Sequence, residues 1–427
     1  MFKRIIQFKL ERIVKKFFKK HPEVKLVAVV GSVGKTSTKI AIGSVLADKF
    51  RVHLHEGNHN SELSAPLAIL GVEYPENIRS IGQWRIALRA ARARIKMPTG
   101  VDVIVQELGT DRIGQIPHFG KYLKPDITVV TAVSPEHMEY FKTMDAVAKE
   151  ELSAVGYSQW SLINRDDVPG EYAANLTTAT ISTYGSTDVA EYRFEADDFT
   201  LEDGYKGRFI APEFEDVIHV EAPVIGEHAT RSVAAAGAVA ARLGMSPEEI
   251  AAGMKKIHPV NGRMNLLRGT DGTYIIDDSY NSSPAAVASA LRTLYQLNVP
   301  QRIAVLGSMN ELGDMSAQAH QDIAELCDGS QLAYVITVGA EAEKHITSIA
   351  QTNGCQVLNA KSAIEAGAMV NKLLEPGGVA LFKGSEGGIY LEEGIKVVLH
   401  STADEEHLVR QSPAWLEKKR AFFSDIS

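Results

Sequence analysis

The most constraining feature of the sequence is a glycine-rich loop between a short apolar segment and a helical pattern. Residues 24–30 (VKLVAVV) are apolar and β-branched, as in a buried strand, and residues 31–37 (GSVGKTS) follow them directly. A helical pattern then continues to about Lys49. Glycines let backbone N–H groups turn towards phosphate oxygens, and the helix start adds the positive end of its dipole. This order predicts a phosphate-binding site and excludes the dinucleotide fingerprint GxGxxG.

Two side chains of the loop have different expected roles, one in charge neutralisation and one in metal binding. Lys35 would place a point charge on the phosphates, and the Thr36 hydroxyl would bind Mg²⁺. The full pattern GxxxxGK[ST] has a glycine at the position that Val29 occupies here, so the motif is a shortened one. We expect phosphate contacts from six residues: Gly31, Ser32, Gly34, Lys35, Thr36 and Ser37.

Short apolar segments alternate with helical ones along most of the chain, which predicts an α/β fold with parallel sheets covered on both faces. Further strands are expected at 101–106 and 127–133, and then at 273–276, 302–306, 334–338 and 378–382. Residues 180–224 alternate in a way that predicts an antiparallel appendage, and residues 229–257 are Ala-rich and helical.

We predict four segments from these patterns. They are a basic amphipathic helix (1–22), a central phosphate-binding domain with a parallel sheet (23–258), a smaller Rossmann-like α/β domain (259–398) and a charged helical tail (399–427). Residues 259–263 (PVNGR) are interpreted as the linker between the two domains.

The charge is unevenly distributed between the first helix and the remainder. The whole chain has a formal net charge of −8, whereas residues 1–21 hold eight Lys or Arg and one acid, Glu11. The acidic balance argues against a dedicated nucleic-acid binder. Apolar residues recur in the helix at three- and four-residue steps, from Phe2 to Phe18. Two interpretations stay open, a helix packed on its own domain and a helix lying on an anionic membrane surface.

Other features bear on the compartment. The two cysteines, Cys327 and Cys355, match no metal-binding spacing and fit a reducing cytoplasm. No apolar run reaches the roughly 18 residues that a spanning helix needs, and the N-terminus lacks the apolar block of a secretory signal.

Several motifs, in this order and spacing, resemble the Mur ligases, and most closely the member that adds D-alanyl-D-alanine. The strings DDSYN and LGxMxELG…H are the most specific for that member. Beyond the loop, the matching segments are GNHNSELSAP (57–66), ELGTDRIGQI (107–116), SPEHMEYF (134–141), NGR (261–263), DDSYNSSP (277–284), VLGSMNELGDMSAQAH (305–320) and FKGSEGG (382–388).

The resemblance implies an ATP- and Mg²⁺-dependent carboxylate–amine ligase. In that chemistry ATP phosphorylates a terminal carboxylate, and an amine attacks the acyl phosphate to give an amide, ADP and phosphate. Catalytic positions carried over are Lys35, Glu107 and His137, with Glu107 and His137 also as Mg²⁺ ligands beside Thr36. A solvated acid and a structural histidine are the alternatives.

The resemblance also assigns nucleotide and substrate positions. Asn58 and Asn60 would face the substrate, with turn formation as the alternative. Nucleotide contacts would come from Arg263, Asp278, Tyr280 and Asn281. The incoming dipeptide would lie near His320, Lys383 and Ser385, for which surface or capping roles are the alternative.

Three departures from the family pattern qualify these expectations. The family has a carbamylated lysine fourteen residues after the Mg²⁺ histidine, where this chain has Glu151. Our hypothesis is that Glu151 supplies a catalytic, metal-binding carboxylate directly; an exposed acidic pair with Glu150 is the alternative. The family's adenine-binding amides are replaced in residues 226–232 (GEHATRS), where Arg231 could stack on the base. Only 23 residues precede the predicted phosphate-loop strand, so we expect the family's UDP-binding domain to be lacking.

We therefore predict a cytoplasmic, monomeric peptide ligase of cell-wall precursor synthesis. Our hypothesis is that residues 2–20 place it at the inner face of the membrane. Its substrates would be ATP, a peptide carboxylate on an unidentified carrier, and D-alanyl-D-alanine or another amine. Two alternatives stay open: a ligase of the folate or polyglutamate type, and a non-catalytic nucleotide-binding partner protein.

Overall fold

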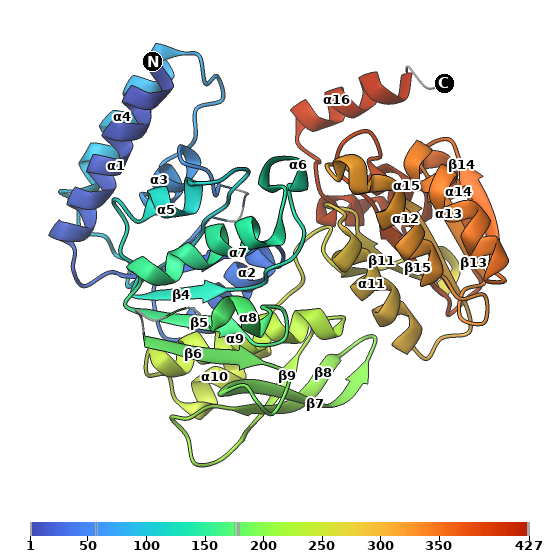
Figure 1. Ribbon diagram of the computed structural model, residues 1–427, viewed down its shortest axis with the longest axis horizontal. Coiled ribbons are helices and arrows are strands. Elements are labelled where there is room, and N and C mark those ends of the chain that lie inside the picture. Colours follow the sequence, from blue (N-terminus) through green and yellow to red (C-terminus); the bar gives the residue numbers. More distant parts are fainter. Residues whose placement is uncertain (1, 56, 58, 175, 177–179, 425–427) are drawn as a thin grey trace. The chain divides into compact units, whose positions relative to one another are not determined.

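The structure, a computed structural model, describes residues 2–424 except 56, 58, 175 and 177–179. The chain forms two compact units, each described by itself (Figure 1). Unit 1 comprises residues 1–223 and 229–258, and unit 2 comprises residues 224–228 and 259–427.

Unit 1 is built on a single nine-stranded sheet with the order β2-β3-β1-β4-β5-β6-β7-β8-β9. Neighbours from β2 to β7 are parallel, and only β7, β8 and β9 pair antiparallel. The segment predicted as an antiparallel appendage therefore continues the main sheet, and its first strand, β6, is a parallel strand. The strands are β1 (Lys25–Val30), β2 (Val52–Leu54), β3 (Val103–Glu107), β4 (Ile127–Val130), β5 (Trp160–Asn164), β6 (Thr180–Gly185), β7 (Tyr192–Thr200), β8 (Gly204–Ile210) and β9 (Ile218–Ala222).

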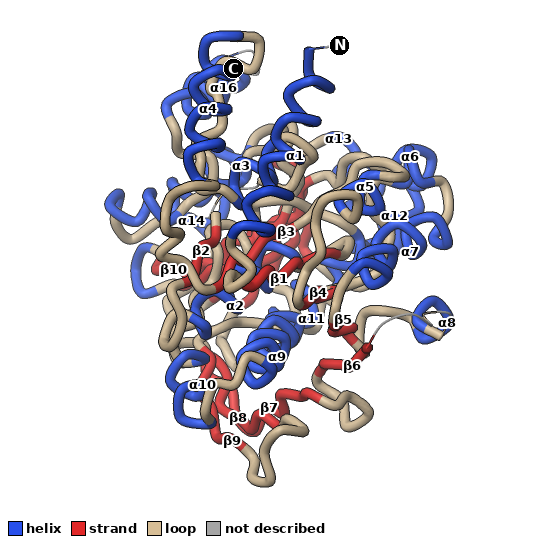
Figure 2. The backbone as a smooth tube through the Cα atoms, turned by 90° about the vertical axis from the view of Figure 1, so that its left-hand side faces the viewer, coloured by secondary structure: helices blue, strands red, loops and turns tan. Residues whose placement is uncertain are grey.

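Helices cover this sheet, as its central strands require, since all their residues except Lys25 are buried. Figure 2 shows α1 and α4 on one side of the strands and α9 and α10 beside β7–β9. The helices are α1 (Phe2–Lys20), α2 (Lys35–Leu46), α3 (Ser64–Ile69), α4 (Ile81–Arg94), α5 (Gln115–Phe119), α6 (Met138–Phe141), α7 (Met144–Leu152), α8 (Gly170–Ala173), α9 (Glu227–Arg242) and α10 (Pro247–Met254).

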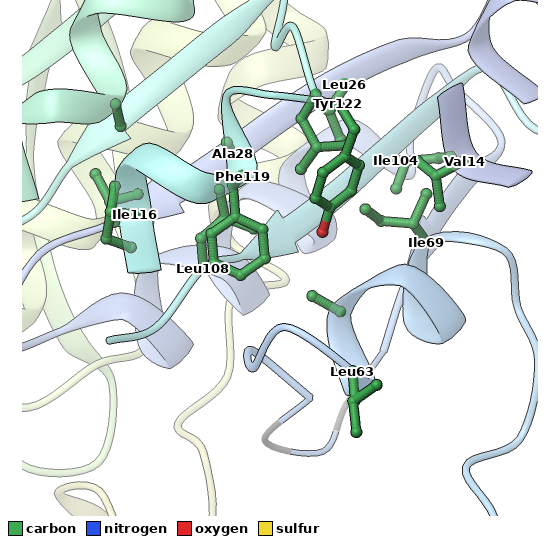
Figure 3. Close-up of a cluster of buried hydrophobic side chains, with 14 of the residues drawn as sticks. Val14, Leu26, Ala28, Leu63, Ile69, Ile104, Leu108, Ile116, Phe119 and Tyr122 are labelled. Atoms are coloured by element: carbon green, nitrogen blue, oxygen red, sulfur yellow. The ribbon is translucent and has the colours of Figure 1, made fainter. Parts of the chain in front are cut away.

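The first helix packs on unit 1 along its inner face. Its buried residues, Ile6, Leu10, Ile13, Val14 and Phe17, join the core that also holds strands β1 and β3. In Figure 3, Val14 lies beside Ile69 of α3 and Ile104 of β3. The interpretation of a helix packed on its own domain is thus confirmed for this face.

Unit 2 contains a six-stranded sheet with the order β10-β11-β15-β12-β13-β14. It is parallel except for β10, which pairs antiparallel with β11. The elements are β10 (Asn265–Arg268), β11 (Tyr274–Asp278), α11 (Pro284–Gln296), β12 (Arg302–Gly307), α12 (Ser316–Glu325), β13 (Tyr334–Val338), α13 (Ala340–Thr352), β14 (Gln356–Ala360), α14 (Ala363–Leu373), β15 (Val379–Lys383), α15 (Leu391–Val398) and α16 (Pro413–Ser424).

The charged tail is part of unit 2 through a buried ion cluster. Glu392 of α15 is fully buried and lies 2.7 Å from the Arg410 guanidinium and 3.4 Å from Lys419 Nζ of α16. Lys419 also pairs with Glu393. Tyr390 packs against the rings of Trp415, Phe422 and Phe423. The tail is therefore anchored by both charge and apolar contact.

Among the described residues, none of the helices is long and apolar enough to cross a membrane.

Opposite faces of α1 should respond differently to mutation. Phe17 is 5% exposed and Phe8 is 57% exposed. We expect Phe17→Ala to lower the free energy of unfolding of unit 1 by about 3–5 kcal/mol, because it leaves a cavity in the core. The matched change Phe8→Ala should shift it by less than about 0.5 kcal/mol. Urea denaturation followed by circular dichroism measures both, and equal effects would contradict the packing of α1.

Candidate active site

The phosphate loop joins β1 to α2, and its glycines have backbone conformations that other residues rarely adopt. Gly31 has φ +126° and Gly34 has φ +86°. A Cβ atom at Gly31 would lie 2.3 Å from Thr131 Oγ1 and 2.8 Å from the backbone nitrogen of Ala132. The loop thus needs glycine at Gly31 for both conformation and space.

The segment after β4 holds the loop from the other side. Backbone N–H of Ser32 donates to Ala132 O at 3.0 Å, and Ser32 Oγ accepts from Ser134 N–H at 2.8 Å. Thr131 Oγ1 donates to Val33 O at 2.6 Å. These bonds fix the path of the backbone that would face the phosphates.

The Lys35 ammonium lies over its own loop. It donates to the carbonyl oxygens of Gly31 and Ser32, and it lies 3.7 Å from Glu136 Oε2. The cation of the motif is thus at the loop, as predicted, and shares that place with an acid.

Two carboxyl groups are buried at the same point. Glu151 is fully buried, and its Oε2 accepts from Gly31 N–H at 2.7 Å. Burial raises the pKa of Glu136 well above its ordinary value; Lys35 opposes this rise, and Glu151 adds to it. Burial also raises the pKa of Glu151, again against the effect of Lys35. Two acids here face one lysine.

The fit of a divalent cation can be tested on these carboxyl groups. Among the described residues, Glu136 Oε1 and Glu151 Oε1 are buried and receive no hydrogen bond, and the buried Glu107 Oε2 has an ion pair with Lys39 Nζ at 3.4 Å but no hydrogen bond. Buried carboxylate oxygens of this kind are the ligands that Mg²⁺ takes. The residues at the loop therefore fit Mg²⁺, although within the described part of the chain no three His, Cys, Asp or Glu side chains gather into a ready-made metal site.

The other predicted magnesium ligands are placed separately. Glu107, at the end of β3, lies 3.4 Å from Lys39 Nζ and accepts from Asn60 Nδ2 at 3.0 Å. His137 Nε2 lies 3.7 Å from Asp111 Oδ1. Thr36 is buried in the first turn of α2. Asn60 thus positions Glu107, while Asn58 lies outside the described residues.

Sequence reasoning missed Glu136 and Lys39. Glu136 directly precedes the predicted metal histidine, and that adjacency is a signal that could have identified it. Lys39 is 2% exposed and lies one helical turn after Lys35, facing Glu107 and the carbonyl oxygens of His55 and Gly57. A buried lysine cannot be distinguished from a surface lysine by sequence alone.

Comparison with known proteins now adds the family. Residues 29–240 match the Mur ligase middle domain, and residues 262–386 match the domain described as Mur ligase, glutamate ligase domain. This chain belongs to the Mur ligase family.

Curated relatives of this Mur ligase are named UDP-N-acetylmuramoyl-tripeptide–D-alanyl-D-alanine ligase. The protein of Bacillus subtilis is 26% identical over 88% of this chain and 76% of its own length. That of Borreliella burgdorferi is 26% identical over 78% of this chain, and that of Mycobacterium bovis 29% identical over 74%. The matches span 66% and 58% of those two relatives.

Solved structures show the same fold. MurF from Acinetobacter baumannii has a TM-score of 0.73 at 23% identity, covering 89% of this chain and 77% of that one. MurF from Thermotoga maritima, solved in complex with ADP, has a TM-score of 0.70 at 21% identity, covering 96% and 84%. Folylpolyglutamate synthase from Mycobacterium tuberculosis has a TM-score of 0.64 at 15% identity, covering 89% and 92%. The predicted α/β fold with two Mur ligase domains is confirmed.

In unit 2 of this Mur ligase, the loop after β11 is held by two buried cations. Lys383 Nζ donates to Asn281 O at 2.6 Å and lies 3.0 Å from Asp278 Oδ2. Arg410 donates to Ser279 O at 2.8 Å and to Tyr280 O at 3.0 Å. Hydrogen bonds from these two cations thus hold the backbone carbonyl groups of residues 279–281 in the predicted nucleotide loop.

The NGR segment packs against the same loop. The Arg263 guanidinium lies 4.1 Å from the centroid of the Tyr280 ring, and Tyr280 N–H donates to Gly262 O at 3.0 Å. All four predicted nucleotide residues of unit 2, Arg263, Asp278, Tyr280 and Asn281, therefore lie together at the carboxyl end of β11, where ligands of open α/β sheets bind.

The residues predicted to lie near a dipeptide hold loops in this structure. His320 is fully buried, its Nε2 accepts from Met309 N–H at 2.9 Å, and its Nδ1 donates to Ser316 O at 2.7 Å. Ser385 Oγ accepts from Asn310 N–H at 2.9 Å. His320 and Ser385 thus position the loop after β12, and contact with a substrate stays a prediction.

Two expectations from the sequence are corrected. The alternative of an exposed acidic pair is wrong, because Glu150 and Glu151 are 3% and 0% exposed. Glu150 instead accepts from the backbone N–H groups of Gly114 and Ile116. Arg231 pairs with Asp166 and Asp167, at 3.3 Å from each, so its guanidinium is held by acids in this structure.

The first acid of the DDSYN loop gives a test by pH. Burial raises the pKa of Asp277 to about 6 from an ordinary value of 3.8. The folded state therefore holds a proton that the unfolded state releases, and this contribution to stability is lost as the pH rises from about 4 to above 6. We expect the free energy of unfolding of Asp277→Asn to match that of the wild type near pH 4 and to exceed it at pH 8 by about 3 kcal/mol.

Thermal unfolding across that pH range measures the difference. The neighbouring change Asp278→Asn is the control, because it deprives the buried Lys383 of its ion pair and should destabilise unit 2 at pH 8. A parallel pH dependence of Asp277→Asn and the wild type would contradict the buried, protonated carboxyl group.

Proposed function

We propose that this Mur ligase joins a peptide carboxylate to D-alanyl-D-alanine with the hydrolysis of ATP, in the synthesis of a cell-wall precursor. The observation that carries the proposal is the clasped phosphate loop with Lys35 over it and buried carboxyl groups beside it. The names of the curated relatives supply the substrates of the proposal.

In this reaction, some residues would bind the nucleotide and others would neutralise charge. The acceptor carboxylate attacks the γ-phosphorus of ATP, and the bond to the β-γ bridging oxygen breaks, so that ADP leaves. The amine then attacks the acyl carbon, phosphate leaves, and the amine loses a proton. Lys35 and the loop N–H groups would neutralise the charge on the transferred group. Arg263 and the loop from Asp278 to Asn281 would bind the nucleotide.

We further propose that Glu136 and Glu151 together fill the place of the family's carbamylated lysine. A carbamate offers two oxygens on a long side chain, and Glu151 alone has a shorter reach. Glu136 lies against Glu151 and adds a second carboxyl group at the same point. With Thr36, Glu107 and His137, these residues would hold Mg²⁺, which supplies charge neutralisation at the phosphates when bound.

We also propose that the protein is cytoplasmic and monomeric and that it contacts the inner face of the membrane through the basic helix α1. The cations of residues 2–20 and the exposed side chains Phe2, Ile5 and Phe8 support this contact.

Removing Glu151 tests the carboxylate hypothesis. We expect Glu151→Ala to lower ligase activity at limiting Mg²⁺ at least about tenfold, with partial recovery at high Mg²⁺, because one oxygen ligand is lost. Glu136→Gln should act in the same direction. The exposed Glu139 of α6 provides the matched control Glu139→Ala.

A second measurement makes the result independent of turnover. Titration of Mn²⁺ into the protein with ADP, followed by electron paramagnetic resonance, should show weaker Mn²⁺ binding for the Glu151 and Glu136 variants. Unchanged activity at limiting Mg²⁺ together with unchanged Mn²⁺ binding would reject these residues as ligands.

The substrates are tested by ADP release. The purified protein is mixed with ATP, one of several candidate peptide carboxylates, and either D-alanyl-D-alanine or a single amino acid, and products are identified by mass. We expect ADP release that needs both acceptor and D-alanyl-D-alanine, and its loss in Lys35→Ala. ADP release with a single amino acid would favour a ligase of the folate or polyglutamate type. The folylpolyglutamate synthase described above has a similar fold. Nucleotide binding without release under any pairing would favour a non-catalytic partner.

A further inference from the structure

Helices α1 and α4 lie side by side and point the same way. Their contacts place them together, and both figures of the whole chain show them along each other. His21, just after α1, donates through Nε2 to the carbonyl oxygen of Ile95, just after α4, at 3.2 Å. The C-terminal ends of the two helices meet, so both helices run in the same direction and their N-terminal ends lie at the same end of the pair. Both helices rise about 1.5 Å per residue, so Ile81, the first residue of α4, lies beside the turn of α1 that holds Gln7.

This pair of helices gathers exposed apolar side chains. Seven of the fifteen large apolar residues that are exposed in the described chain lie on α1, on α4 or in the segments flanking α4: Phe2, Ile5, Phe8, Ile78, Ile81, Ile86 and Met97. Ile86 is 71% exposed and Phe8 is 57% exposed. Single exposed apolar residues are ordinary, but a concentration on two adjacent helices indicates an interaction surface.

Hydrogen bonds fix the backbone at the start of α4, where apolar side chains are exposed. Trp84 of α4 is 2% exposed, and its Nε1 donates to the carbonyl oxygen of Ile78 at 2.9 Å. Ser80 caps the helix by accepting from Gln83 N–H. The turn before α4 is thus anchored from inside, while Ile78 and Ile81 stay exposed.

The same helices carry a concentrated positive charge. Together α1 and α4 hold twelve Lys or Arg and one acid, in a chain whose net charge is −8. That acid, Glu11, lies 2.6 Å from His118 Nε2 of α5 and is mostly buried. The cations of the outer faces include Arg12 and Lys16 of α1 and Arg85 and Arg89 of α4.

We propose that the outer faces of α1 and α4, with the turn of residues 78–80, form one docking surface for an anionic phospholipid membrane. We call it the two-helix surface. It rests on the membrane contact proposed above for α1 and extends that contact to α4, which the sequence did not single out. Each Lys or Arg near an anionic bilayer is attracted to it, and exposed Ile and Phe side chains are stabilised by entering the boundary of the acyl chains. Nucleic acid would use the cations but would give the isoleucines nothing to bind.

The test uses the full chain and vesicles of two compositions. Sedimentation is measured with phosphatidylcholine vesicles and with an equal mixture of phosphatidylcholine and phosphatidylglycerol. The α4 variants are Ile81→Ser with Ile86→Ser, and Arg85→Ala with Arg89→Ala. Their controls, exposed residues elsewhere, are Val189→Ser with Ile364→Ser, and Lys344→Ala with Lys361→Ala. Circular dichroism verifies that each variant is folded.

We expect binding to the anionic vesicles only, weakened at least about tenfold by either α4 pair and unchanged by the control pairs. Loss of binding at high salt should accompany it. If the wild type does not bind anionic vesicles, both the membrane contact and the two-helix surface are rejected. If it binds and the α4 variants bind equally, contact through α1 stands and the two-helix surface is rejected. If only the arginine pair matters, the surface binds polyanions and the lipid assignment is overturned.

Discussion

The hydrogen bond from Gly31 N–H to Glu151 Oε2, at 2.7 Å, is the interaction on which the active-site half of unit 1 depends. It ties the first residue of the phosphate loop to α7, which lies more than a hundred residues later in the chain. The loop is clasped by the segment after β4 as well, because the parallel register pairs Val30 with Val130 and so places residues 131–134 beside it. The geometry of a seven-residue motif is thus fixed by three elements that only the completed sheet brings together.

Buried charge follows one rule through most of the molecule and departs from it at this loop. Lys39 faces Glu107, and Lys383 faces Asp278. In the tail, Arg410 and Lys419 face Glu392 and Glu393. Removing water from such groups is expensive unless each charge meets its opposite. At the phosphate loop, Glu136 and Glu151 meet one ammonium, Lys35, and burial raises the pKa of both acids. An excess of buried acid beside a phosphate site is where a divalent cation restores the balance.

The sequence was sufficient to predict the strands that follow a regular apolar pattern. All seven predicted strands exist, because each is an apolar β-branched run with turn residues at its ends. Four strands were missed: β2 is three residues long, β5 and β10 mix polar with apolar residues, and β14 is half exposed. The phosphate loop was predictable because its chemistry is local. The function of Arg410 was not, since its partners, the carbonyl oxygens of Ser279 and Tyr280, lie far along the chain, where no periodicity indicates them.

The first helix shows why an amphipathic pattern cannot by itself distinguish a core helix from a membrane helix. Both uses require apolar residues at three- and four-residue steps beside cations. The structure separates the two sets by burial: Ile6, Leu10 and Phe17 are in the core, whereas Ile5 and Phe8 are exposed among lysines and arginines. The inner set binds the helix to unit 1, so the outer set is presented on a fixed frame, and its ordering entropy is already lost on folding. A surface ordered in this way can bind a bilayer with fewer apolar residues than a free helix needs, because binding does not have to fold it.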